Sequence, residues 1–319
     1  MTQEQLTIVI FGALLVLALI FDLGLLSKKS SHITIRKALL QTAFWVSLAL
    51  GFFVFMWVQR GQRLALEYLS AYLMEWSLSI DNIFVFILIF NFFGVKEKFY
   101  ARVLLIGILM AIVFRIAFIA IGIELIERFH WLLYVFGAIL VYTGIRMFRA
   151  GAEEEVNLEE NRVYKIMKKV FRLSHSDGDG KLSIRVDGKR YYTSIFAVIV
   201  MLATTDIIFA LDSIPAVFAI STDKLVIYTS NIFAVLGLRS LFFLLRGAVS
   251  KFSHLQQGIA LVLVFIGGKM LVEIFGIHVE VYISLLVILT SIAGSIVYSL
   301  TYNAREKRRS ADRIKDEQP

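Results

Sequence analysis

Four acidic residues lie inside long apolar segments of the chain, as two pairs with the same spacing. The pairs are Glu75 with Asp81 and Asp206 with Asp212, and in each the second acid follows the first by six positions. A charged side chain at the centre of a membrane-spanning helix costs about 2.5–3.5 kcal/mol on insertion scales. A structural role remains open, with the acids protonated or paired with buried arginines. The matched spacing favours a functional site.

The ligands that these segments offer are all oxygen atoms. Asn82 and Ser213 directly follow the second acid of each pair and can add an amide and a hydroxyl oxygen. Oxygen ligands suit Mg²⁺, Ca²⁺ and Mn²⁺, whereas Zn²⁺ and Cu⁺ favour imidazole or sulfur. The chain has no cysteine, and its five histidines lie outside the acidic segments. The sequence therefore predicts a site for a hard or borderline divalent cation, with no permanently bound cofactor.

Helix geometry places a condition on such a site. Two residues six apart on a regular helix are separated by ~9 Å of rise and ~120° of rotation, so they cannot chelate one ion unaided. Pro215 lacks an N–H and leaves the carbonyl of Leu211 without its helical partner. We therefore predict a helix break at Pro215, with two broken or bent helices forming the site near the middle of the membrane.

The charge balance of the site predicts coupling to protons. Four carboxylates exceed the charge of one divalent ion, so either bound protons or nearby cations must compensate. Arg115 and Arg239 lie inside other apolar segments and are predicted to face the bundle interior as such cations, rather than extend to a lipid headgroup. Metal binding would release the remaining protons, which predicts exchange of metal for protons across the membrane.

The composition places these residues in an all-α, polytopic transmembrane helical bundle. Hydrophobic residues make up 58% of the 319 positions and charged residues 18%, too few for the surface of a soluble domain of this size. The apolar residues form blocks of about 20, the length that crosses the bilayer as a helix. They do not alternate as lipid-facing strands would. We predict about nine spans, at residues 6–26, 38–58, 66–93, 101–123, 131–148, 193–220, 225–245, 255–275 and 279–302.

The basic residues give the orientation. Of the 33 Lys and Arg residues, 26 lie in loops and a tail on one predicted side, four lie on the other side and three lie within spans. By the positive-inside rule, the N-terminus is predicted outside and the C-terminus in the cytoplasm. The positive net charge of +8 is therefore explained by topology and is not taken as a sign of nucleic-acid binding.

An internal repeat relates the third to fifth spans to the sixth to eighth. Arg115 precedes His130 by fifteen positions, and Arg239 precedes His254 by the same interval. Three spans per unit invert the second unit relative to the first, an arrangement that many transporters share. The predicted organisation is a two-span segment (1–65), the first repeat (66–148), a cytoplasmic loop with a hairpin (149–192), the second repeat (193–276), a last span (277–302) and a charged cytoplasmic tail (303–319). Within the loop, Asp187-Gly188 between short alternating runs predicts the turn of the hairpin.

The motifs resemble those of the TerC family of integral membrane proteins. The matching stretches are Glu75-Trp-Ser-Leu-Ser-Ile-Asp81-Asn82, Thr205-Asp206-Ile-Ile-Phe-Ala-Leu-Asp212-Ser-Ile-Pro-Ala216, Asp187-Gly-Lys-Arg190 and Tyr228-Thr-Ser-Asn-Ile-Phe-Ala-Val-Leu-Gly-Leu-Arg239. The resemblance implies a bacterial inner-membrane protein that exports Mn²⁺, with the four acids at the ion path. One departure is Ala203-Thr204-Thr205 before Asp206, where relatives often carry another acid, and it leaves the number of ligands open.

Two other classes of function remain as alternatives. A non-transporting stress or assembly factor could use the loop at 149–192, and transport assays would separate it from an exporter. An intramembrane aspartyl protease also places two acids in facing spans, but its Tyr-Asp and Gly-x-Gly-Asp contexts are not found at Asp81 or Asp212. We therefore predict a transporter and not an enzyme, with a divalent cation, protons and the lipid bilayer as its partners. No feature of the sequence specifies an oligomeric state.

Overall fold

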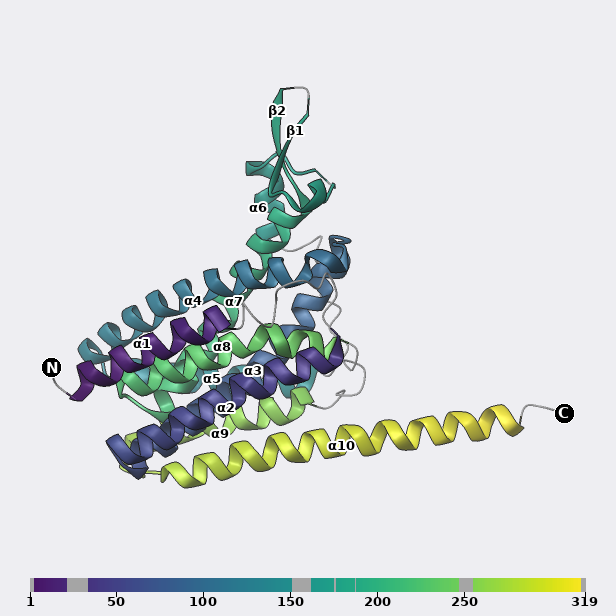
Figure 1. Ribbon diagram of the computed structural model, residues 1–319. Helices are drawn as coiled ribbons and strands as arrows, with labels where there is room; N and C mark the ends of the chain where they lie inside the picture. The colour runs from purple at the N-terminus through teal and green to yellow at the C-terminus, as the bar shows by residue number, and fades with distance from the viewer. Residues whose placement is uncertain are drawn as a thin grey trace.

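The protein is a helical bundle that carries a small β-hairpin at one end (Figure 1). The computed structural model describes residues 3–21, 34–150, 162–174, 176–186, 188–246 and 255–316. The helices are α1 (Gln3–Phe21), α2 (Ile35–Arg60), α3 (Gln62–Phe92), α4 (Glu97–Arg128), α5 (Leu132–Ala150), α6 (Arg162–Val170), α7 (Ser194–Ile220), α8 (Lys224–Leu245), α9 (Leu255–Val272) and α10 (Val281–Asp316), with short 3₁₀ turns η3 (Gly178–Gly180) and η5 (Glu273–Phe275).

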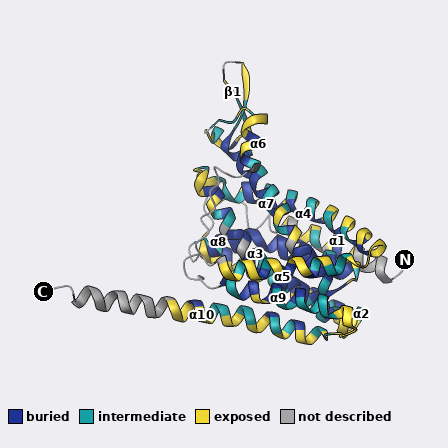
Figure 2. Cartoon of the chain, turned by 180° about the vertical axis from the view of Figure 1, so that it is seen from behind, coloured by how far each residue is buried: buried dark blue, intermediate teal, exposed yellow. Residues whose placement is uncertain are grey.

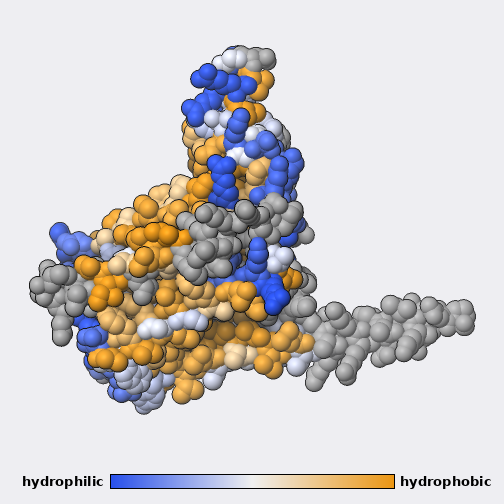
Figure 3. All heavy atoms as spheres, in the orientation of Figure 1, coloured by the Kyte–Doolittle hydropathy of each residue, from blue (hydrophilic) through white to orange (hydrophobic). Residues whose placement is uncertain are grey.

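Eight of the described helices are long and apolar enough to cross a membrane: α2, α3, α4, α5, α7, α8, α9 (with η5) and the part of α10 up to Tyr302. They correspond to the second to ninth predicted spans, so a polytopic helical membrane protein is confirmed. The predicted first span, 6–26, overlaps α1, whose described apolar stretch, Val9–Ala18, is shorter than a span. Residues 22–26 of that prediction lie outside the described part of the chain. Apolar side chains cover the face of the bundle seen in Figure 3.

Helix α8 occupies the centre of the bundle. It is buried along nearly its whole length, and it packs against α2, α3 and α4 (Figure 2). The side-chain carboxylate of Asp223 begins this helix by accepting a hydrogen bond from the N–H of Val226 at 3.1 Å. Helices α3 and α4 also pack against α7, so the segments that carry the predicted acids lie next to one another.

Helices α5 and α9 approach closely enough that their backbones touch at glycine. A Cβ added to Gly267 would lie 2.5 Å from the carbonyl oxygen of Gly137, whereas one added to its neighbour Gly268 would meet no atom within 4 Å. Small residues at helix contacts allow such close packing in membranes. The two adjacent glycines therefore form a matched pair for testing this interface.

We expect Gly267→Ala to lower the free energy of unfolding by about 1–3 kcal/mol, because the methyl group would force α5 and α9 apart. Gly268→Ala should be neutral or slightly stabilising, since alanine favours helix and the space is open. Chemical unfolding in detergent micelles measures both variants. Equal stability of the two proteins would contradict the close α5–α9 contact.

The hairpin consists of β1 (Ser183–Val186) and β2 (Lys189–Tyr192), paired antiparallel with Val186 opposite Lys189. The strands flank the predicted turn at Asp187-Gly188, of which Asp187 lies outside the described residues and Gly188 has φ +73°. The hairpin region contacts the start of α4, since Lys96 pairs with Asp177 at 2.8 Å and Lys98 with Asp179 at 3.0 Å. The hydrogen bond from Lys96 lowers the pKa of Asp177.

The structure adds a secondary structure to the predicted charged tail. The backbone of α10 stays helical past the last span as far as Asp316. Residues 303–316 contain alanine and several arginines and lysines, which favour helix, and no proline or glycine that would end it. Helix α10 therefore extends beyond the rest of the bundle (Figure 1).

Candidate metal and proton site

Arg115 lies at the centre of the buried polar cluster. Its side chain on α4 is 2% exposed, and the guanidinium faces Asp206 on α7. Nε donates to Oδ2 of Asp206 at 3.0 Å, and Nη2 donates to Oδ1 at 3.1 Å. Such two-point pairing fixes both the position and the orientation of the carboxylate. The predicted pairing of Arg115 with an acid inside the bundle is present in the structure.

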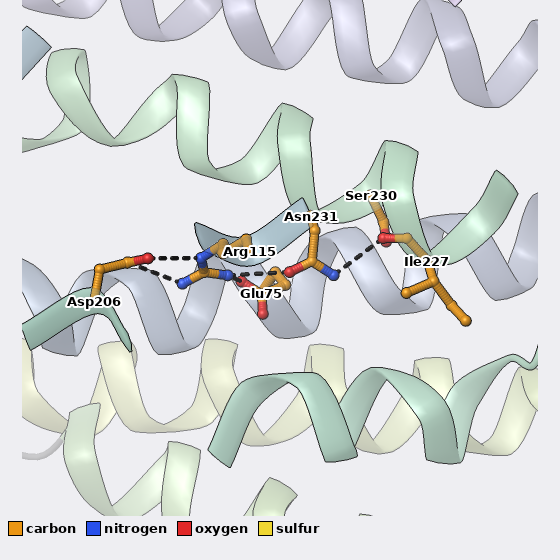
Figure 4. Close-up of polar contacts among 6 residues, drawn as sticks. All are labelled: Glu75, Arg115, Asp206, Ile227, Ser230 and Asn231. Carbon is orange, nitrogen blue, oxygen red and sulfur yellow. Dashed lines mark hydrogen bonds and ion pairs between the residues drawn. The ribbon is translucent and has the colours of Figure 1, made fainter. Parts of the chain in front are cut away.

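Two further residues complete the cluster around Arg115. Glu75 on α3 forms an ion pair with Nη1 of Arg115 and is fully buried. Asn231 on α8 accepts a hydrogen bond from the same nitrogen at 3.0 Å, while its own amide donates to the carbonyl of Ile227 at 3.1 Å (Figure 4). We refer to Glu75, Arg115, Asp206 and Asn231 as the central cluster; its members come from four different helices.

The charges in the central cluster do not balance when both acids are ionised. Two carboxylates then face one guanidinium, which leaves a net charge of −1 in a water-excluded region. Oε1 of Glu75 is buried and has no hydrogen-bond partner among the described residues. A buried oxygen that accepts no hydrogen bond destabilises the folded protein unless a proton or a cation binds to it. The cluster can therefore take up a positive charge, and a proton or a metal ion would each suit the unpaired oxygen.

The other predicted site residues lie at different levels of the bundle. Asn82 and Ser213 are buried, each seven positions after the central acid of its helix, which is a rise of roughly 10 Å. Helices α3 and α7 both take part in the central cluster but run in opposite directions, so these two residues lie on opposite sides of it. Arg239 is buried on α8, eight positions after Asn231. The side chains of Asp81 and Asp212 lie outside the described part of the structure.

Among the side chains that the structure describes, no three of His, Cys, Asp and Glu gather as they would around a metal ion. Of the four predicted acids, Glu75 and Asp206 are among those side chains, and Asp81 and Asp212 lie outside them. Glu75 and Asp206 approach each other through Arg115, and Oγ of Ser79 and of Ser213 lack a hydrogen-bond partner in the described regions. These hydroxyls are further oxygen atoms available beside the acidic segments.

The helix break predicted at Pro215 is not present. Helix α7 runs without interruption from Ser194 to Ile220 and contains Pro215. Proline removes one backbone hydrogen bond, but the bonds on either side and the buried packing of Ile214 and Ala216 hold the helix together. Helix α3 is likewise continuous, and Oγ of Ser77 donates to the carbonyl of Leu73 at 2.6 Å within its own helix.

Sequence reasoning missed two buried polar residues. Asn231 was part of a recognised motif but had no assigned role; its position in an otherwise apolar helix was the available signal. Glu67 lies eight positions before Glu75 on α3, and it accepts hydrogen bonds from Arg63 at 3.1 Å and from Ser221 at 2.6 Å. The sequence signal for Glu67 was weaker, because it stands next to the predicted end of a span.

Comparisons with known proteins agree with this architecture. The family model described as "Integral membrane protein TerC family" matches residues 60–308. An uncharacterised membrane protein of Myxococcus xanthus is 40% identical over 95% of this chain and 94% of its own length. One from Rickettsia prowazekii is 37% identical over 92% of this chain and 98% of its own.

A third relative, from Escherichia coli K12, carries the name of a proposed membrane-bound redox modulator, Alx. It is 36% identical over 93% of this chain and 95% of its own length. No solved structure gives a significant match. Because the family model covers most of the chain and relatives of similar length exceed 30% identity, the protein belongs to the integral membrane protein TerC family.

Proposed function

We propose that the protein exports a divalent metal cation from the cytoplasm across a bacterial inner membrane in exchange for protons. Mn²⁺ is the first candidate for this ion and Ca²⁺ is the second. The observation that carries this proposal is the central cluster, in which one oxygen of the fully buried Glu75 has no hydrogen-bond partner among the described residues, beside Arg115 and Asp206. A buried site with excess negative charge suits a cation that arrives and leaves. The family resemblance favours Mn²⁺, and the all-oxygen ligands are compatible with it.

The packing of the bundle supports the inverted repeat on which this proposal depends. If α3, α4 and α5 correspond to α7, α8 and α9, the contact of α3 with α8 corresponds to that of α7 with α4. Both contacts are present, and α5 packs directly against α9. The central cluster joins the two units, since Glu75 and Arg115 come from the first and Asp206 and Asn231 from the second. Transporters built this way bind their ion at the repeat interface.

The proposed orientation places the hairpin in the cytoplasm. Lys96, Arg102 and Arg246 lie at the hairpin end of the bundle, where Arg102 donates to the carbonyl of Gly180 at 3.2 Å and Arg246 pairs with Glu97 at 2.9 Å. This accumulation of basic residues is what the positive-inside rule expects of a cytoplasmic face. The N-terminus would then be outside and the C-terminus inside.

The name of the Escherichia coli relative refers to redox modulation, and this chain cannot perform thiol redox chemistry because it has no cysteine. A cation exporter needs only the oxygen ligands and charges described above. We therefore assign the buried acids to ion transport.

Metal uptake into inverted membrane vesicles tests the function. We expect Mn²⁺ uptake by the wild-type protein, and Asp81→Asn and Asp212→Asn should each reduce it by roughly 10- to 100-fold because each removes a charge and a ligand without changing size. Asp179→Asn is the matched control, since this carboxylate is 86% exposed in the hairpin region. Parallel assays with Ca²⁺ and Mg²⁺ rank the ions. Normal uptake by both Asp81→Asn and Asp212→Asn, at normal protein levels, would reject the site.

A further inference from the structure

A small cavity lies directly beside Asp206 between α3, α4, α7 and α8. About 10 Å³ is open to the centre of a water molecule, which is room for about one water. The wall is apolar and includes Leu104, Ala111, Leu202 and Leu238, and of its described lining residues only Asp206 is charged. Among the described lining residues, the cavity therefore touches the central cluster at one carboxylate and meets no other ligand for a cation.

The cavity lies on the hairpin side of the central cluster. Helix α4 begins at the hairpin end, and Leu104 and Ala111 precede Arg115 along it. Helix α7 also begins at that end, and Leu202 is one turn before Asp206. The cavity therefore lies between Asp206 and the hairpin end of the bundle.

The same cavity is too narrow for a hydrated ion in this conformation. A Cβ added to Gly107 on α4 would lie 3.3 Å from Cβ and Cδ1 of Leu202 on α7, so the two helices are closed against each other here. A divalent ion with its bound waters needs more space than one water molecule occupies. A narrow apolar constriction of this kind excludes ions because it does not stay wet.

Aromatic side chains fill the bundle on the other side of Glu75. Tyr68 lies two turns before Glu75, and its ring packs 5.3 Å from that of Phe52 and 6.4 Å from that of Phe233. The Tyr68 hydroxyl also donates to the carbonyl of Ala49 at 3.2 Å. The central cluster thus has tight aromatic packing toward the opposite end and a small cavity toward the hairpin end.

We propose that this cavity is the closed apolar gate through which a cation enters from the hairpin end, and that it opens when α4 and α7 separate at the Gly107–Leu202 contact. The identity of the ion that passes this gate rests on the proposed function. The position of the gate, and the side of the membrane to which it opens, can be measured without a transport assay. An ion that passes it meets Asp206 first and then Arg115, which already holds that carboxylate. Entry of the ion would therefore compete with the guanidinium for the same oxygens.

Cysteine labelling tests the gate, and the absence of native cysteine removes any background. Ala111→Cys places a thiol in the cavity wall with little change in volume. Val113→Cys, on the lipid-facing side of α4 (64% exposed), and Ala71→Cys, buried on α3 one turn before Glu75, are the controls. Lys189→Cys in the exposed hairpin shows which face of the vesicle the hairpin occupies. The reagent is the membrane-impermeant trimethylammonium-ethyl methanethiosulfonate, applied to vesicles of both orientations.

We expect Ala111→Cys to react about tenfold faster than either control when the reagent is on the hairpin side, because opening at the Gly107–Leu202 contact lets water and reagent reach this thiol but neither control thiol. A rate equal to the controls, or faster reaction from the opposite side, overturns the gate. Added Mn²⁺ should slow the reaction. Fast labelling that Mn²⁺ leaves unchanged supports the gate and contradicts the proposed function, so the two failures are distinguishable.

A second substitution tests whether the apolar wall restricts access. Leu202→Asn is similar in size to the native side chain but favours water in the cavity. In the Ala111→Cys background it should accelerate labelling several-fold, on the order of tenfold. An unchanged rate, in a protein that still elutes as a single species on size exclusion, contradicts gating by the apolar wall.

Discussion

Replacing Arg115 with methionine is expected to destabilise the protein by about 3–5 kcal/mol and to abolish transport. The change keeps much of the side-chain volume but leaves Glu75 and Asp206 as buried acids without their shared partner. Removing one member of a buried ion pair is strongly destabilising because the remaining charge is not compensated. Chemical unfolding in detergent micelles, together with metal uptake in vesicles, measures both effects.

Two further proteins separate charge from packing in this experiment. Arg128→Met is a control on the same helix; Arg128 pairs with Glu124 at the exposed end of α4, so a loss of less than about 1 kcal/mol is expected. Combining Arg115→Met with Glu75→Gln and Asp206→Asn should recover much of the stability, because no buried charge is then left unpaired, but should not recover transport. If Arg115→Met unfolds like the wild-type protein, the central cluster does not contribute as described.

Transport of the metal against its own concentration gradient is expected to stop almost completely when the proton gradient is removed. A divalent ion that enters the net negative charge of the central cluster competes with protons for the same oxygens, so binding of one releases the other. In proteoliposomes loaded with a pH-sensitive dye, metal flux should be matched by an opposite proton flux. With equal metal concentrations on both sides, collapsing the proton gradient should reduce the initial rate of net metal movement to about a tenth or less of its value.

The matched controls for coupling come from the acids themselves. Asp212→Asn should remove metal flux and proton flux together, whereas Asp179→Asn in the exposed turn should change neither. Metal movement at full rate with the gradient collapsed, and without proton counterflow, would show that this coupling is wrong. A uniport or a different counter-ion would then replace it.

The sequence by itself determined the class of the protein and most of its spans. Apolar blocks of about 20 residues can only be helices in a bilayer, so α2 to α5, α7 to α9 and the first part of α10 follow from composition and length. The dipeptide Asp187-Gly188 between two short alternating runs predicted a hairpin turn, and β1 and β2 lie on either side of this dipeptide. The sequence also singled out Glu75, Arg115 and Asp206 as candidate site residues, because a charge inside an apolar helix has a free-energy cost whichever helices pack around it.

Only the tertiary structure decided which of these charges meet. The pairing of Arg115 with Asp206 joins residues 91 positions apart, and the pairing with Asn231 joins residues 116 apart. Sequence spacing constrains neighbours along one helix but not the rotation and depth of one helix against another. The same limit explains the prediction at Pro215, since local chemistry predicted a break and the surrounding packing kept α7 continuous. It also explains why the cavity beside Asp206 could not be foreseen, because residues of four helices, α3, α4, α7 and α8, form its wall.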